Sequence, residues 1–86
     1  MPEISRFFGI IIRMFYDEHP PPHFHVEYGE HQASLRVDTL EIVRGKLPRR
    51  VLALVAEWTL LHRAELVENW RLAEEGQPVR PIEPLE

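Results

Sequence analysis

The sequence predicts an α+β fold, in which a small, mainly antiparallel sheet of three or four strands packs against a C-terminal helical segment. Residues 23–38 alternate between apolar and polar side chains around a central Gly29-Glu30 pair, which is typical of a β-hairpin. Residues 48–75 carry apolar side chains at helical spacing between an opening proline and a closing glycine. The strand signals precede the helical signal, and 86 residues allow a single domain.

Residues 7–16 form the first predicted strand, because aromatic and β-branched residues dominate both of its faces. A strand that is apolar on both faces needs cover on both, and one layer of helix covers only one. We therefore expect Phe7, Ile11 and Phe15, which share a face, to contact a second layer. That layer is expected from the proline-rich loop, the C-terminal tail or another chain.

Residues 17–22 contain three consecutive prolines and form a stiff loop that leads into the hairpin. The two-residue hairpin turn fixes the register, so that Tyr28 pairs with His31 and His23 pairs with Arg36. One face of the hairpin is then mostly apolar and the other wholly polar. The apolar and polar residues of both strands fall on matching faces under one assumed turn, which makes this hairpin the best supported element.

The C-terminal half contributes one weak strand, the helix and a tail. A short strand is predicted over residues 41–44, although the turn before it lacks the expected glycine. Residues 77–86 hold three prolines and form either a disordered tail or an extended segment docked on the domain. The helical segment presents one apolar stripe to the sheet: Val51, Leu54, Val55, Trp58, Leu61, Leu66, Trp70 and Ala73.

Composition excludes several classes of site. The formal net charge is −4, and the basic cluster of Arg44, Lys46, Arg49 and Arg50 fits a solvated loop better than a nucleic-acid contact. Cysteine is absent, so a metal would need imidazole and carboxylate ligands. The opening residues lack signal-peptide features, and the apolar run over 7–12 is too short to span a bilayer. We expect a cytoplasmic protein without membrane partners.

Residues 17–25, which include the three consecutive prolines, hold three of the five histidines. His23 and His25 lie at i and i+2 of a strand, so their imidazoles project from one face about 6 to 7 Å apart. One divalent transition metal can reach both rings. In a straight helix, His62 and Glu65 would share the apolar sector and could join this cluster across a polar cavity. A bend near His62 would instead turn them outward.

Two explanations for the histidines are open. They are either metal ligands or a polar, water-facing strand surface whose imidazoles pair with Glu27, Asp17 or Glu18. Nucleophilic catalysis and nucleotide hydrolysis lack support, because the few hydroxyl groups sit in no base-and-orienter pattern and the glycines are scattered. The other candidate site residues are His19, Asp17, Glu27, Arg36 and Asn69.

Five segments of the sequence form a recognisable pattern: residues 2–10, the block from Tyr16 to His25, Glu27-Tyr28-Gly29, Gly45-Lys46-Leu47-Pro48 and Glu68-Asn69-Trp70. In these segments the chain resembles the small bacterial family catalogued as domain of unknown function 4160. The resemblance brings no catalytic residues. It implies a genetic context, in which genes of the family often sit beside those of domain of unknown function 2442 in a two-gene unit resembling a toxin–antitoxin pair.

We predict a protein-interaction module of a toxin–antitoxin-like two-gene system, bound to a partner of the domain of unknown function 2442 type or to a second copy. An alternative is a metal-dependent hydrolase or nuclease that uses the histidine cluster and a divalent transition metal. A third, weaker hypothesis is a nucleic-acid-binding regulator. The predicted interface residues are Phe7, Ile11, Phe15, Leu60 and Val67; the last two lie opposite the apolar stripe of the helix.

Overall fold

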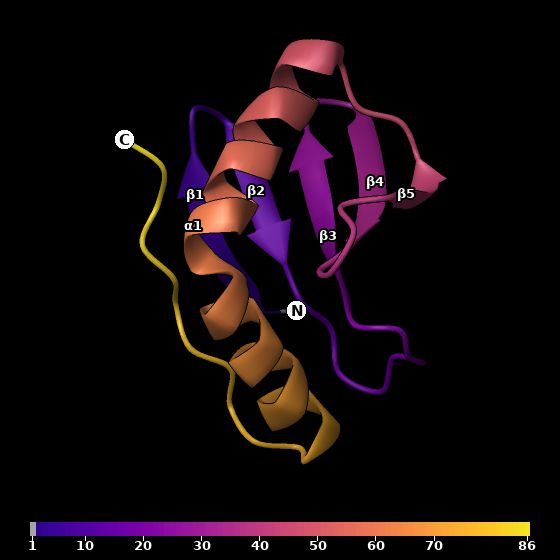
Figure 1. Cartoon of the computed structure of the whole chain (residues 1–86), viewed down its shortest axis with the longest axis vertical. Coiled ribbons are helices and arrows are strands. Elements are labelled where there is room, and N and C mark those ends of the chain that lie inside the picture. The colour runs from indigo at the N-terminus through magenta and orange to yellow at the C-terminus, as the bar shows by residue number, and fades with distance from the viewer. Residues whose placement is uncertain (1) are drawn as a thin grey trace.

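The computed structural model describes residues 2–86, which form a five-stranded antiparallel sheet and one helix. Figure 1 shows α1 lying across one face of the sheet, whose strands follow the chain order. The predicted α+β class is confirmed, with five strands in place of three or four. The elements are β1 (Glu3–Phe7), β2 (Ile10–Arg13), β3 (His23–Tyr28), β4 (His31–Arg36), β5 (Ile42–Gly45) and α1 (Arg49–Glu74).

The single strand predicted over residues 7–16 is wrong, because a turn at Phe8 and Gly9 divides this region between β1 and β2. Both turn residues have positive φ, 51° for Phe8 and 80° for Gly9. The turn places Phe7 opposite Ile10 in the sheet. The alternation of inward and outward side chains therefore begins again in β2, so odd-numbered Phe7 and even-numbered Ile10 share one face of the sheet. Phe7 is therefore buried in the core against Trp58, and its predicted place at an interface is wrong.

The hairpin of β3 and β4 has the register counted from the sequence, from Tyr28 opposite His31 to His23 opposite Arg36. β5 adds the outer strand beside β4. Its turn contains Leu40 at a φ of 65°, the left-handed conformation for which glycine was expected. A non-glycine residue thus makes this turn, which is why its sequence signal is weak.

The helix backbone leaves helical geometry at His62, where φ is −126° and ψ is 22°. The bend that the sequence left open is therefore present. Leu61 is exposed and does not belong to the apolar stripe, although Trp58 in the preceding turn is fully buried. Leu60 and Val67 are exposed, as predicted. No helical segment within residues 2–86 combines the length and apolar character that crossing a membrane requires.

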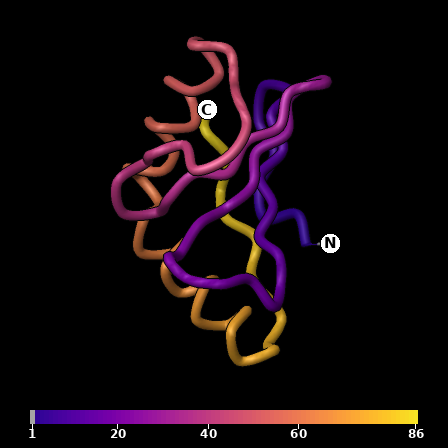
Figure 2. The backbone as a smooth tube through the Cα atoms, turned by 90° about the vertical axis from the view of Figure 1, so that its right-hand side faces the viewer, coloured from indigo at the N-terminus to yellow at the C-terminus, as the bar shows by residue number. Residues whose placement is uncertain are grey.

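The C-terminal tail after α1 is docked along the domain, which resolves the two alternatives (Figures 1 and 2). The Ile82 amide donates to the Ile4 carbonyl over 2.7 Å, and the Trp58 indole N–H donates to the Glu83 carbonyl over 2.8 Å. Ile82 and Leu85 are buried in the core. The tail thus covers apolar surface beside β1 and α1 and leaves the polar face of β3 open.

Candidate metal centre

The loop between β2 and β3 places the Glu18 carboxylate in front of two imidazoles. His23 and His25 alternate with buried Phe24 and Val26 along β3, so both rings lie on the polar face of the strand. Nε2 of His25 contacts Glu18 Oε1, and Nε2 of His23 lies 3.2 Å from the same oxygen. One ligand atom from each of these three residues lies within 4.8 Å of the other two. The cluster therefore converges on one point.

Hydrogen bonds hold the opposite edges of both rings. Nδ1 of His23 donates to the Pro21 carbonyl over 2.8 Å, and Nδ1 of His25 is hydrogen-bonded to Ser34 Oγ at 3.1 Å. A carbonyl can only accept, so the proton of a neutral His23 lies on Nδ1 and its Nε2 presents a lone pair to the cluster. Metal-ligating histidines typically have their second nitrogen held in this way.

Aromatic side chains restrict the two rings further. The Phe15 ring centroid lies 4.3 Å from that of His25, and the Trp70 centroid lies 5.2 Å from that of His23. The side chains of His23, His25 and Glu18 are 14 %, 24 % and 28 % exposed, respectively. The rings are thus packed on their outer sides, while the carboxylate between them is reachable from solvent.

The two imidazoles stabilise the charged form of Glu18. Partial burial raises the pKa of this carboxyl, but the hydrogen bond with His25 and the charges of His25 and His23 lower it by more. The pKa of Glu18 therefore lies below its usual value. At neutral pH the cluster offers a carboxylate, which is the form that binds a cation.

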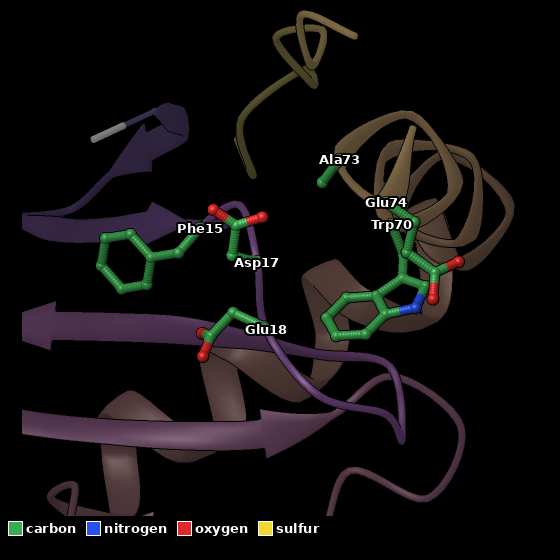
Figure 3. Close-up of a pocket in the computed structure, with 6 residues that line it drawn as sticks. All are labelled: Phe15, Asp17, Glu18, Trp70, Ala73 and Glu74. Atoms are coloured by element: carbon green, nitrogen blue, oxygen red, sulfur yellow. The ribbon is translucent and has the colours of Figure 1, made fainter. Parts of the chain in front are cut away.

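Two hollows adjoin the carboxylate. The first is about 190 Å³ in volume, and Figure 3 shows Trp70 and Glu74 descending into it from α1, with Asp17 and Glu18 on the loop opposite. A second, wider hollow is lined by Glu18 and His25. Solvent, or a ligand, therefore reaches the cluster from more than one side.

His62 and Glu65 do not join the cluster, contrary to the larger predicted ligand set. They form a separate pair, with His62 Nδ1 2.6 Å from Glu65 Oε1. Among residues 2–86, the convergent group of potential ligands is Glu18, His23 and His25. Glu18 was considered only as a partner for an imidazole, because no spacing rule shows how a proline-rich loop folds back over a strand.

The other predicted site residues have separate partners. Glu27 accepts a hydrogen bond from Arg13, and Arg36 donates two to the carboxylate of Asp38. Asn69 is buried, donates to the Arg80 carbonyl and accepts from the Arg80 amide, so it fastens the tail. Asp17 is exposed on the rim of the first hollow, and His19 is exposed on the same loop.

Two imidazoles and one carboxylate are a ligand set found in catalytic zinc sites and in non-haem iron sites. Both kinds of site keep at least one coordination position for water or substrate. The donor chemistry, the fixed ring orientations and the access from solvent therefore fit a divalent transition metal. They fit calcium or magnesium poorly, since those ions take oxygen ligands.

A family model described as "Domain of unknown function (DUF4160)" matches residues 9–71 of the chain. The matched region includes Glu18, His23 and His25 and extends into the second half of α1. No curated protein and no solved structure matches the chain.

Proposed function

The chain belongs to the family of domain of unknown function DUF4160, and we propose that it binds one divalent transition metal through Glu18, His23 and His25. One observation carries the proposal. The two Nε2 atoms meet the same carboxylate oxygen, while the Nδ1 atom of each ring has its own hydrogen-bond partner. The three side chains thus form a small, preoriented cation site.

Charge balance supports a cation between these groups. Because Nδ1 of His23 donates to a carbonyl, a neutral His23 turns the lone pair of Nε2 toward the carboxylate of Glu18. Two acceptors facing each other are satisfied by a proton or by a metal ion. The metal competes with the proton, so binding releases protons and strengthens as the pH rises.

The chemistry that we assign to the centre is metal-dependent hydrolysis, as in a small hydrolase or nuclease. A bound divalent ion supplies Lewis acidity and lowers the pKa of a coordinated water. In this proposal His23, His25 and Glu18 hold the ion, and the Phe15 and Trp70 rings pack against the imidazoles and restrict their motion. The first hollow beside Glu18 is open to a small substrate.

Calorimetric titration of tag-free protein with Zn²⁺ tests the binding. We expect one ion per chain in the wild type and loss of binding in the His23→Ala/His25→Ala variant, because only one ligand remains. His31→Ala is the matched control, since His31 is exposed on β4 outside the cluster. Equal uptake by the wild type and the double variant would refute the metal centre.

Turnover of generic ester and phosphodiester probes tests the hydrolytic part. We expect hydrolysis that requires the metal and is abolished by a chelator and by Glu18→Ala. Stoichiometric metal binding with no turnover of any probe would contradict catalysis and leave a structural or sensory metal site.

A second candidate function is supported by an apolar surface on α1. Leu60, Leu61 and Val67 are 64 %, 66 % and 51 % exposed, on the side of the helix that faces away from the core. Such a surface supports a protein-interaction role, which we propose operates in a toxin–antitoxin-like two-gene system. The proposed occupant is a partner protein of the domain of unknown function 2442 type.

A native mass spectrum of the co-expressed proteins tests this role. We expect a complex that Leu60→Asp abolishes while the circular dichroism spectrum stays unchanged. His31→Asp is the control for an added charge elsewhere on the surface. A complex that withstands Leu60→Asp would show that the helix surface is not the interface, and the absence of a complex would exclude this partner.

A further inference from the structure

We propose that the ligand of the metal centre carries an oxyanionic group, a phosphate or a carboxylate, and that Arg44 binds this group on the open face of the sheet. The inference rests on the proposed metal site and names the chemical class of its substrate. It follows from the strand register, from the groove beside the cluster and from the ion pairs of the other strand arginines.

The strand register places Arg44 in line with the metal cluster. Arg44 on β5 pairs with Ser34 on β4, and Ser34 pairs with His25 on β3. Directly paired residues share a face of a sheet, so all three side chains lie on the face opposite α1. Two strand spacings separate the Cα atoms of His25 and Arg44, which is about 10 Å. An arginine side chain can span most of this distance.

A groove joins the two ends of this row. Its volume is about 340 Å³, within the range of small-molecule sites. Phe15 lies at the end next to the cluster, and Arg44 and Gly45 line the end on β5. Ser34 and Gln32 provide polar side chains between these ends. Of the three cluster residues, His25 lines the groove, so a ligand there would lie between the His25 side of the cluster and the guanidinium of Arg44.

The charges in the groove favour an anion. Glu27 also lines the groove, but its carboxylate is ion-paired with Arg13 at 2.9 Å. Of the four arginines in the described strands, Arg6, Arg13 and Arg36 pair with carboxylates, whereas the guanidinium of Arg44 makes no hydrogen bond or ion pair with the side chains or backbone of residues 2–86. Arg44 therefore gives the groove a positive charge that no carboxylate of residues 2–86 neutralises.

Guanidinium geometry suits an oxyanion in particular. The planar fork of donors matches two oxygens of a phosphate or a carboxylate, and the bonds are charge-assisted. Lys46 follows Arg44 two positions later in the chain and is a second exposed basic residue at this edge. Together they attract anions toward this edge of the sheet, although the whole protein is acidic.

Binding of phenyl phosphate and of benzoate to the Zn²⁺-loaded protein tests the inference and distinguishes the two anions. We expect at least one probe to bind, and Arg44→Gln to weaken its binding about tenfold or more, since a charge-assisted pair is lost. Arg49→Gln is the matched control, because Arg49 is exposed and does not line the groove. The affinity for Zn²⁺ should be the same in all three proteins.

The outcomes separate this inference from the metal proposal. Equal binding of the favoured probe by wild type and Arg44→Gln, or binding of neither probe, would overturn the role of Arg44 while Zn²⁺ binding stands. Failure of the wild type to take up Zn²⁺ would refute the metal centre. Titration of the metal-free protein with the same probes then decides whether Arg44 binds an anion by itself, and equal affinities for the wild type and Arg44→Gln would overturn its role.

Discussion

Within residues 2–86, two places bring imidazole against carboxylate, and they differ in how the contact arises. In the sheet, His23 and His25 from β3 converge on Glu18 from a loop, with both Nδ1 atoms held by further partners. On α1, His62 and Glu65 are neighbours one turn apart, and the Glu65 side chain is 50 % exposed. The first arrangement depends on tertiary structure, whereas the second joins two residues only three positions apart in the chain. Convergence of three groups distinguishes the proposed metal site from the surface pair.

The two places should differ most in how the affinity for Zn²⁺ responds when their carboxylate is removed. Glu18→Ala should lower the affinity for Zn²⁺ about 100-fold or more, since even partners outside the ligand shell contribute 10- to 100-fold. Glu65→Ala should leave the affinity unchanged, because Glu65 lies outside the convergent group. Competition with a chromophoric chelator measures both. Equal losses in the two variants would show that the helix pair takes part.

Substitution of Gly45 should weaken the edge of the sheet without affecting the ligands. A Cβ at Gly45 would lie 2.1 Å from the Gln32 carbonyl oxygen, and φ there is 82°. Gly45→Ala should therefore destabilise the fold by about 2 kcal/mol and displace β5. Gly29→Ala is the control: its φ is also positive, at 57°, but nothing lies within 4 Å of the added Cβ, so the cost should be about 1 kcal/mol.

Urea unfolding measures both glycine variants, and Zn²⁺ titration of the folded Gly45→Ala protein shows whether the cluster is intact. We expect the affinity of that variant for Zn²⁺ to be retained. Equal stability losses in the two variants would contradict the close approach of β5 to β4.

Loss of the Ser34 hydroxyl, which is hydrogen-bonded to His25, should have a smaller effect on the affinity for the metal. Ser34→Ala removes the partner of His25 Nδ1 and should weaken Zn²⁺ binding about tenfold. Ser5→Ala is the control in the same sheet, because Ser5 Oγ is buried without a hydrogen-bond partner and should not affect the metal. Calorimetric titration would detect the difference. A Ser34→Ala affinity equal to that of wild type would mean that Ser34 does not hold the ring.

The acid dependence of stability should show the smallest effect. Because the pKa of Glu18 is lowered in the folded state, its ionised form stabilises the fold above the pKa of the unfolded state. This contribution is lost as the pH falls through the folded pKa. In chelator, the wild type should therefore lose more stability than Glu18→Gln between pH 5 and about 3. Urea unfolding at each pH tests this, and parallel curves would contradict it.

The sequence was sufficient to predict the fold in those segments where short-range rules determine the structure. The hairpin register follows from alternation on both sides of Gly29, and the positions of His23 and His25 on one face follow from that register. It was insufficient at Phe8 and Leu40, which adopt the left-handed conformation without a composition signal. Local steric rules predict glycine at such positions, whereas packing of neighbouring strands decides in this fold.

For a related reason, only part of the candidate site could be predicted from the sequence. Strand periodicity pairs the two histidines, but the proposed third ligand, Glu18, comes from the loop between β2 and β3 and meets the imidazoles only in the folded chain. Arg44 resembled part of a solvated basic loop because β5 has only four residues, too few to show a period. The open face of the sheet becomes visible only when the strand order is known.

NMR of the imidazole nitrogens during a Zn²⁺ titration tests the metal centre most directly, because it distinguishes each ring and each nitrogen. We predict that Nε2 of His23 and Nε2 of His25 shift to metal-bound positions at one equivalent, that Nδ1 of His23 stays protonated, and that His62 does not respond. Unchanged Nε2 signals in His23 and His25, or a metal-bound shift in His62, would contradict the centre described by Glu18, His23 and His25.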